Sequence, residues 1–112
     1  MLANTISFAL AGLDAYPLTI EADITSGLPL ITIVGLPDNA VKESRERVRL
    51  AIKNSGFCFP SGRITINLAP ADIKKEGPSF DLAIALSVLA ADEQIPAQLL
   101  GSYAFLGELA LD

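Results

Sequence analysis

The chain of 112 residues contains no histidine and no tryptophan, and it has a single cysteine. Without histidine, the chain cannot form a Ser-His-Asp or Cys-His catalytic arrangement, nor a zinc site with the usual ligands. The lone cysteine, Cys58, excludes a disulfide within the chain. Cysteine usage of this kind is typical of a protein in a reducing compartment.

Positive charge is also scarce, because 8 Lys and Arg residues stand against 13 Asp and Glu residues, for a net charge of −5. A domain of this sign has no overall attraction for nucleic acid or for an anionic membrane, so any binding to phosphate has to be local. The start of the chain lacks the positive residues of a secretory signal. The longest apolar run, Leu82 to Ala91 interrupted by Ser87, is well short of the roughly 20 residues that span a bilayer. We therefore expect a cytoplasmic protein with no membrane partner.

The composition that remains is that of a folded domain, with 51% hydrophobic and 19% charged residues. The length predicts one compact domain over residues 1–112. Alternating or dense apolar patterns predict five strands, at residues 5–10, 18–24, 28–36, 63–68 and 103–109. Two helices lie between the third and fourth strands and between the fourth and fifth. The order β-β-β-α-β-α-β indicates an α+β domain with two helices packed on a mixed sheet.

Two strands have an apolar face that the pattern identifies directly. In the first strand Ile6, Phe8 and Leu10 share one face, which predicts that this face is buried. In the second strand the apolar face is formed by Leu18, Ile20, Ala22 and Ile24.

The first helix has clear boundaries, since Asp38 is a plausible N-cap and Gly56 is a typical terminator. Helical periodicity predicts one core-facing stripe, formed by Val41, Ser44, Val48, Ala51, Ile52 and Ser55. A separate basic stripe consists of Lys42, Arg45, Arg49 and Lys53. The basic stripe could bind phosphate groups, as in DNA, or an acidic partner. Alternatively it is a solvated face with i,i+4 pairs such as Glu43–Arg47, which is the usual meaning of charge on a helix.

The loop "GFCFPSGRI" (56–64) is the part of the chain most similar to a phosphate-binding loop. It has five residues between its glycines instead of four, with Arg and Ile in place of Lys and Ser or Thr. It also precedes a strand, whereas a phosphate-binding loop leads into a helix N-terminus. We therefore predict that this domain itself holds no ATP, no metal and no other cofactor.

Ser79 lies in a Gly-Pro-Ser turn that opens into the second helix. As an N-cap, its hydroxyl would accept a hydrogen bond from the amide of Asp81 or Leu82. As a nucleophile it would need a lysine of lowered pKa, because the chain has no histidine. Lys74 and Lys75 are upstream in a charged turn that we expect to be wet, where desolvation could hardly lower a pKa. The sequence favours the cap and predicts no catalytic residue.

Two long segments carry a family resemblance, "VGLPDNAVKESRERVR" (34–49) and "INLAPADIKKEGPSFDLAIAL" (66–86). With the surrounding residues they closely resemble the N-terminal domain of the YifB/ComM family of magnesium-chelatase-like (ChlI-type) AAA+ ATPases. The resemblance covers essentially the whole chain. It implies a domain placed ahead of an AAA+ module, with ATP and Mg bound by that module in the full-length protein.

The family resemblance also implies a function. ComM-like members act in competence as hexameric branch-migration helicases on DNA. The expected role of this domain is then non-catalytic, in assisting ring assembly or in contacting DNA or a partner. Its expected partners are its own AAA+ module and the neighbouring subunits of a hexameric ring, with DNA as a further candidate.

A more distant resemblance connects the chain to the Lon protease catalytic domain and to the C-terminal domain of RadA-type recombination proteins. These share the ribosomal protein S5 domain 2-like fold, which is therefore the expected fold. Gly77-Pro78-Ser79 matches the turn that carries the Lon nucleophile, although Phe80 stands where Lon has a small residue. A Lon-like Ser-Lys peptidase domain lacking its lysine, and a pure protein-interaction module, are the two alternative functions.

Overall fold

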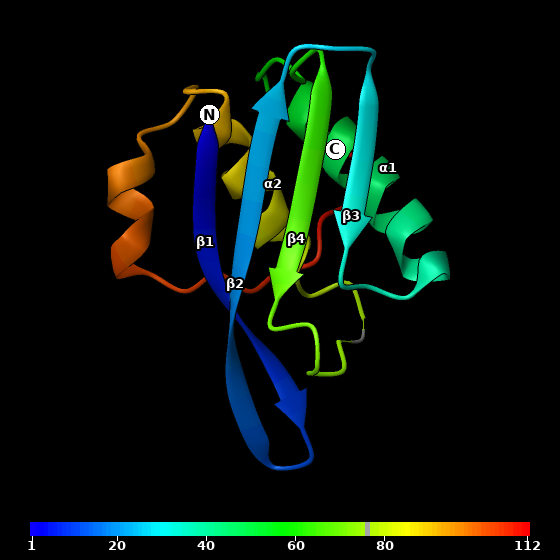
Figure 1. The fold of residues 1–112 in the computed structure, drawn as a ribbon, viewed down its shortest axis with the longest axis vertical. Coiled ribbons are helices and arrows are strands. Elements are labelled where there is room, and N and C mark those ends of the chain that lie inside the picture. Colours follow the sequence, from blue (N-terminus) through cyan, green and yellow to red (C-terminus); the bar gives the residue numbers. More distant parts are fainter. Residues whose placement is uncertain (76) are drawn as a thin grey trace.

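The computed structural model describes residues 1–75 and 77–112, and it has an α+β architecture with one mixed sheet. The four strands, in their order across the sheet, are β1 (Leu2–Ala11), β2 (Asp14–Thr25), β4 (Arg63–Ala69) and β3 (Leu30–Val34) (Figure 1). β2 is antiparallel to both of its neighbours, whereas β3 runs parallel to β4. The mixed sheet predicted from the sequence is confirmed.

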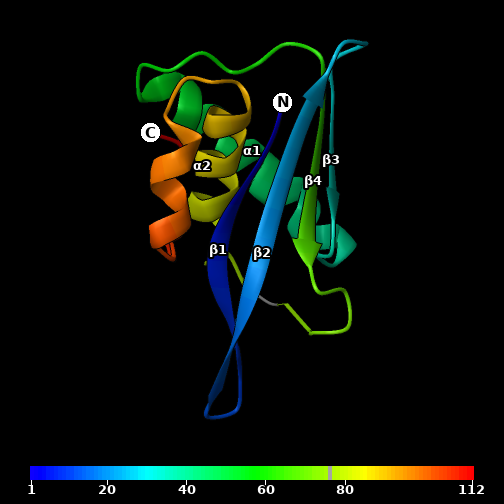
Figure 2. The same cartoon turned by 60° about the vertical axis from the view of Figure 1, so that its left-hand side comes forward.

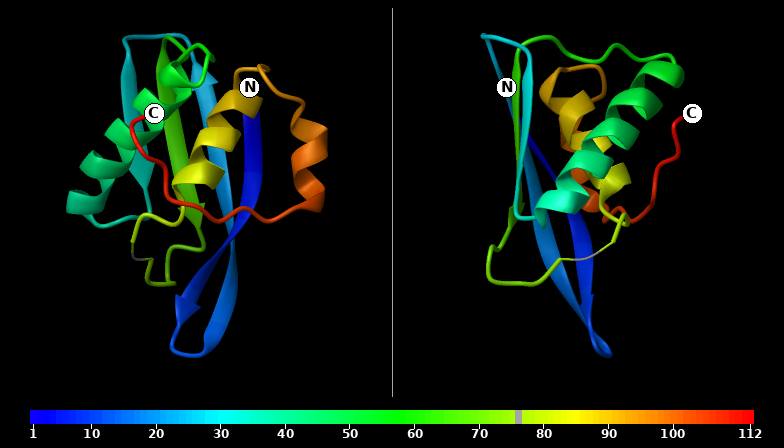
Figure 3. Two further views of the ribbon diagram at one scale, coloured as in Figure 1. Left: turned by 180° about the vertical axis from the view of Figure 1, so that it is seen from behind. Right: turned by 90° about the vertical axis from the view of Figure 1, so that its right-hand side faces the viewer.

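The helices of the described residues lie on one face of this sheet, and none of them covers its other face (Figures 2 and 3). They are α1 (Asp38–Asn54), α2 (Asp81–Ala91) and a 3₁₀ helix, η1 (Ala97–Ser102), which the sequence did not predict. α2 packs on β1 and β2, while α1 packs beside it and closer to β3. Within the described residues, no helix is long and apolar enough to cross a membrane.

The core lies between the sheet and α2. The inner face of β2 is buried at Leu18, Ile20 and Ala22, and β4 contributes Ile64, Ile66 and Leu68 to the same layer. Each of these six side chains has 1% or less of its surface exposed, and Leu18, Ile20 and Ala22 belong to the face of β2 that the sequence predicted to be apolar. Gly35 joins β3 to α1 with φ +104°, and a Cβ there would lie 2.7 Å from the Leu68 carbonyl oxygen. Only glycine fits this approach.

The predicted inner face of β1 is wrong. The strand turns Ala3, Thr5, Ser7 and Ala9 toward the helices, and Leu10 on the opposite face is 79% exposed. Small side chains are needed because α2 is close to the strand, and Thr5 Oγ1 lies 2.9 Å from the Ala83 carbonyl oxygen and 2.7 Å from Ser87 Oγ. Hydrogen bonding to α2 thus overrides the apolar pattern of the strand.

The two ends of α1 give different outcomes. Gly56 ends the helix as predicted: its amide bonds to the Lys53 carbonyl and the Phe57 amide to the Ile52 carbonyl, at 3.4 and 3.2 Å. Asp38, by contrast, is the first helical residue and not the N-cap, which is Pro37. The Pro37 carbonyl accepts the first helical hydrogen bond, from Val41 N at 3.0 Å. Asp38 still places a negative charge in the first turn, where the helix dipole favours it.

The predicted fifth strand at residues 103–109 is also wrong. This segment makes only one bridge to the sheet, between Ile6 and Ala104, with Phe105 N donating to the Ile6 carbonyl at 2.8 Å. It then leaves the sheet, because its polar groups pair with the start of α2. The Gly107 amide donates to the Ser79 carbonyl at 2.9 Å, and the Gly107 carbonyl accepts from Leu82 N at 3.0 Å.

The polar cluster under α2 can be tested with two variants of β1. Among the described residues, the Ser7 hydroxyl is buried with no hydrogen-bond partner. We expect Ser7→Ala to leave the free energy of unfolding unchanged or to raise it, because an unpaired buried hydroxyl is costly. Thr5→Val keeps the side-chain shape but removes two hydrogen bonds, and should lower stability by about 1 kcal/mol. Urea denaturation measures both, and a larger loss for Ser7→Ala than for Thr5→Val would contradict this account.

Candidate functional site

The Gly-Pro-Ser turn lies directly before α2, but Ser79 does not cap it. α2 begins at Asp81, and among the described residues no side chain caps its N-terminus. Both amides that Ser79 was predicted to cap have backbone partners: Asp81 N donates to the Pro78 carbonyl at 3.2 Å, and Leu82 N donates to the Gly107 carbonyl at 3.0 Å. The cap prediction is therefore wrong, because the returning C-terminal segment takes the place of the serine.

Ser79 instead borders a pocket at the base of the β1–β2 hairpin. The pocket has a volume of about 330 Å³, and its lining includes Phe8, Leu10, Lys74, Phe80 and Leu106 beside Ser79. Most of this lining is apolar. The serine is half-buried, and its backbone carbonyl is held by Gly107.

Lys75 is buried, contrary to the expectation of a wet turn. Only 2% of its surface is exposed, and its Nζ donates to the carbonyl oxygens of Pro70 and Ile73 at 2.6 and 2.9 Å. Burial lowers the pKa of the Lys75 ammonium, and the negative charge of Asp72 partly opposes this change. Because two of its N–H groups bond to main-chain carbonyls, Lys75 closes the loop after β4. Lys74, by contrast, is exposed.

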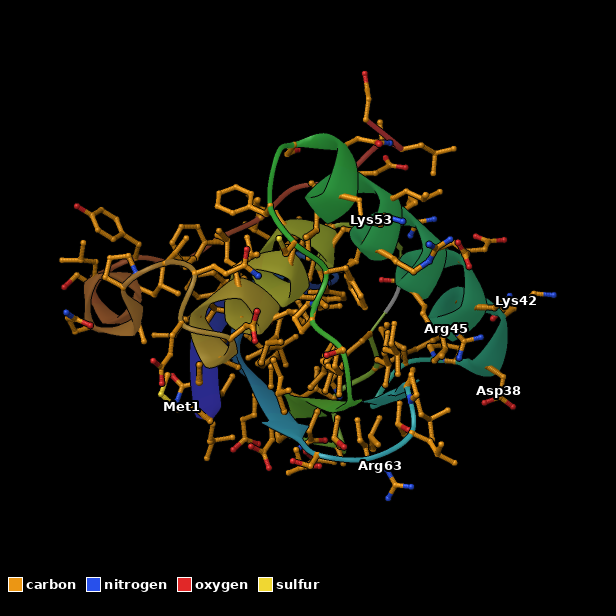
Figure 4. All side chains as sticks on the ribbon, turned by 90° about the horizontal axis from the view of Figure 1, so that it is seen from above. Met1, Asp38, Lys42, Arg45, Lys53 and Arg63 are labelled. Atoms are coloured by element: carbon orange, nitrogen blue, oxygen red, sulfur yellow. The ribbon has the colours of Figure 1, made fainter. Side chains whose placement is uncertain are left out.

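The basic stripe lies on the side of α1 that is nearer to β3. Arg45 Nη1 donates to the Ile31 carbonyl of β3 at 3.4 Å, and Arg49 pairs with Glu46 at 2.8 Å. Lys42 and Lys53 are exposed, and Figure 4 shows Lys42 on the outer side of α1. All four residues lie in α1, at the helical spacing that the sequence predicted. What the stripe binds stays a prediction.

An ion pair that the sequence did not predict connects the two helices. Asp81, 1% exposed, accepts hydrogen bonds from Arg47 Nε at 2.6 Å and Nη2 at 3.2 Å, and from Ser44 Oγ at 2.8 Å. The Leu109 amide donates to the same carboxylate at 3.2 Å. The expected i,i+4 partner of Arg47, Glu43, is present but lies at 3.8 Å and is largely exposed. The one signal in the sequence was an aspartate at the start of an almost wholly apolar helix.

The Asp81–Arg47 pair lies in the wall of a second pocket of about 290 Å³. Its polar lining includes Asn39, Glu43 and Glu108, and the Gly77-Pro78 turn closes one side. The hydrogen bond to Asp81 raises the pKa of Arg47, as do the charges of Asp81, Glu108 and Glu43, against the desolvation that lowers it. Asp81 accepts four hydrogen bonds, from Arg47, Ser44 and the Leu109 amide. The arrangement therefore holds α1, α2 and the C-terminal segment together.

Two observations concern the predicted absence of a metal and of a nucleotide, which stays a prediction. No group of three or more Cys, Asp or Glu side chains among them could hold a metal ion. The loop 56–62 leads into β4 and not into a helix, and a Cβ on Gly62 would lie 2.6 Å from the Thr25 carbonyl oxygen. Gly62 therefore allows the loop to pack closely against β2. A loop that leads into a strand does not fit a nucleotide phosphate.

Comparison with known proteins places these features in a family. A family described as subunit ChlI of Mg-chelatase matches residues 20–112. The YifB protein of Salmonella typhimurium is 57% identical over 103 residues, which cover 92% of this chain and 20% of that protein. The YifB protein of Escherichia coli is 55% identical over the same shares. The competence protein ComM of Haemophilus influenzae is 49% identical over 110 residues, covering 98% of this chain and 22% of ComM.

These matches define a magnesium-chelatase-like domain. The chain belongs to the ChlI family of Mg-chelatase subunits, with YifB and ComM proteins among its relatives, as the sequence resemblance implied. It spans about a fifth of the length of these relatives.

The buried lysine predicts a specific pH dependence. Because the pKa of Lys75 is lower in the folded state than in the unfolded state, the unfolded state binds the proton more tightly. The stability of the wild type relative to Lys75→Met should therefore rise as pH increases through the range between that lowered value and about 10.4. At neutral pH the variant should lose about 1–3 kcal/mol, since it leaves two carbonyls unpaired.

Lys42→Met is the matched control, because it makes the same change at an exposed position. Urea denaturation at several pH values between neutral and alkaline gives the free energies of unfolding. A stability difference between the two variants that falls as pH rises would contradict the buried position of Lys75.

The two acidic partners of Arg47 give a second test. Asp81→Ala should lower the free energy of unfolding by about 3 kcal/mol, because it leaves a partly buried guanidinium, a hydroxyl and an amide without their acceptor. Glu43→Ala removes the exposed partner and should cost less than about 0.5 kcal/mol. Thermal or urea denaturation distinguishes these outcomes, and equal losses would show that the buried pair is not the stronger one.

Proposed function

We propose that this chain is a non-catalytic N-terminal domain of a magnesium-chelatase-like AAA+ ATPase, and that it assists ring assembly or contacts DNA or a partner. One observation carries the proposal: ComM covers 98% of this chain, yet the match takes up only 22% of ComM. An ATPase module then has ample room in the remaining chain. The domain would be an accessory part of a larger enzyme.

In this proposal ATP and Mg are bound by the AAA+ module. The loop 56–62 supports this division, because its geometry does not fit a nucleotide phosphate. The partners proposed are the AAA+ module of the same chain and the neighbouring subunits of a hexameric ring, in the cytoplasm. By similarity to ComM, the full-length protein would act in competence as a branch-migration helicase on DNA.

We also propose that the domain has the ribosomal protein S5 domain 2-like fold, as implied by its distant resemblance to Lon. The mixed sheet with helices on one face is compatible with that fold. The Lon-like peptidase alternative is a domain that lacks the lysine serving as base to Ser79. Lys75 is the buried lysine near this turn, but two of its N–H groups donate to the Pro70 and Ile73 carbonyls. This pairing supports a structural role for it.

The proposal is tested by changing Ser79 in the full-length protein. Ser79→Ala should leave the ATPase rate and DNA branch migration unchanged, and should change the free energy of unfolding by no more than about 0.5 kcal/mol, because the hydroxyl caps nothing. A fluorophosphonate probe should not label the wild-type protein. Covalent labelling that is lost in Ser79→Ala would overturn the non-catalytic assignment in favour of the peptidase.

A further inference from the structure

The two edges of the sheet differ in how they are protected. At the β1 edge, the segment around Ala104 bridges to Ile6, so that edge is partly paired. β3 forms the other edge, and in the described part of the chain no strand pairs with its outer side. An unpaired edge is a template for adding a strand from another chain. β3 is therefore the open edge of this molecule.

The direction of the free groups on β3 follows from two hydrogen bonds. Leu30 N donates to the Gly62 carbonyl at 3.3 Å, on the side of β4. Residues alternate along a strand, so Thr32 and Val34 also face β4, whereas Ile31 and Ile33 point their N–H and C=O groups to the open edge. The bond from Arg45 Nη1 to the Ile31 carbonyl confirms this direction. At 3.4 Å that bond is long, and one side chain covers one carbonyl only.

The surroundings of the edge differ on the two sides of the sheet. On the helix side, Arg45 touches the strand, and the exposed Lys42 follows it on the same stripe. Arg49 is engaged by Glu46 at 2.8 Å, and Asp38 is the other acidic residue on this side of α1. On the helix-free side, Leu30 and Val34 are about half exposed. An added strand would thus meet positive charge on one face and apolar surface on the other.

We propose that β3 binds an extended segment of a partner protein in which acidic and apolar residues alternate, added to the sheet as a fifth strand. Successive side chains of a strand point to opposite faces, so one set reaches Lys42 and Arg45 while the other packs beside Leu30 and Val34. Main-chain hydrogen bonds to the Ile31 N–H and to the N–H and C=O groups of Ile33 supply affinity, and the alternation supplies specificity. This strand addition would be the partner contact of the proposed function, and it rests only on the proposal that the domain contacts a partner.

A synthetic peptide of alternating Glu and Val between flanking Thr residues is the probe, labelled with a fluorophore and titrated into the full-length protein. We expect saturable binding, and slower amide hydrogen exchange in peptic fragments that contain residues 30–34. A peptide of the same composition with its Glu and Val residues in two blocks should bind about tenfold more weakly, because its charges cannot all face α1.

Arg45→Glu should weaken binding of the alternating peptide by about tenfold, since an attraction at the edge becomes a repulsion. The matched control is Arg63→Glu, which makes the same charge change on the helix-free face (Figure 4) and should have a smaller effect. Circular dichroism checks that both variants are folded. Because ATP is not needed in this assay, its failure would leave the non-catalytic assignment intact.

Three results would overturn the proposal. The first is equal binding of the alternating and block peptides. The second concerns the protein without peptide. If amide hydrogen exchange of residues 30–34 then becomes slower as the protein concentration rises, the edge binds a second copy of the chain. The third is no peptide binding together with Arg45-dependent binding of single-stranded DNA. That DNA binding would have a log–log salt slope of about −0.7 per phosphate contact, and it would assign the stripe to nucleic acid.

Discussion

The packing of the helices depends on the hydrogen bonds that the Asp81 carboxylate accepts. This carboxylate is buried at the start of α2 and is held by Arg47 and Ser44 of α1 and by the Leu109 amide. A buried carboxylate is stable only when its lone pairs are satisfied, so these three segments have to meet at one point. The same junction directs the C-terminal segment away from the sheet. By holding α1 against α2, this junction also sets the position of α1 beside β3 and therefore the position of the basic stripe.

The turn that precedes Asp81 has the sequence of a catalytic motif, but its residues make structural contacts. Gly77-Pro78-Ser79 lies at the mouth of α2, as the Lon resemblance implied, but backbone groups of residues 78 and 107 fill the roles that the serine could have had. Lys75 is buried nearby and is committed to two carbonyls. The buried Lys75 and the Ser79 backbone are thus held by main-chain hydrogen bonds, which is consistent with an accessory domain in a larger ATPase.

The surface of the domain is as informative as its interior. One face of the sheet is covered by helices and the other is free, and the sheet has one partly paired edge and one open edge. The domain carries a net charge of −5, so the positive side chains near the open edge, Lys42 and Arg45, form a local positive patch on an acidic surface. A domain built in this way can make directional contacts through main-chain groups without a deep pocket.

The sequence by itself determined the α+β class, the first four strands, both helices and the family, because these follow from local periodicity, glycine positions and long matching segments. It also placed the basic stripe on one helical face. The inner face of β1, the irregular path of residues 103–109, the burial of Lys75 and the Arg47–Asp81 pair were decided only by the tertiary structure. Each depends on a hydrogen-bond partner far away in the chain, such as Ala83 for Thr5 or Leu109 for Asp81, and no local pattern encodes such partners.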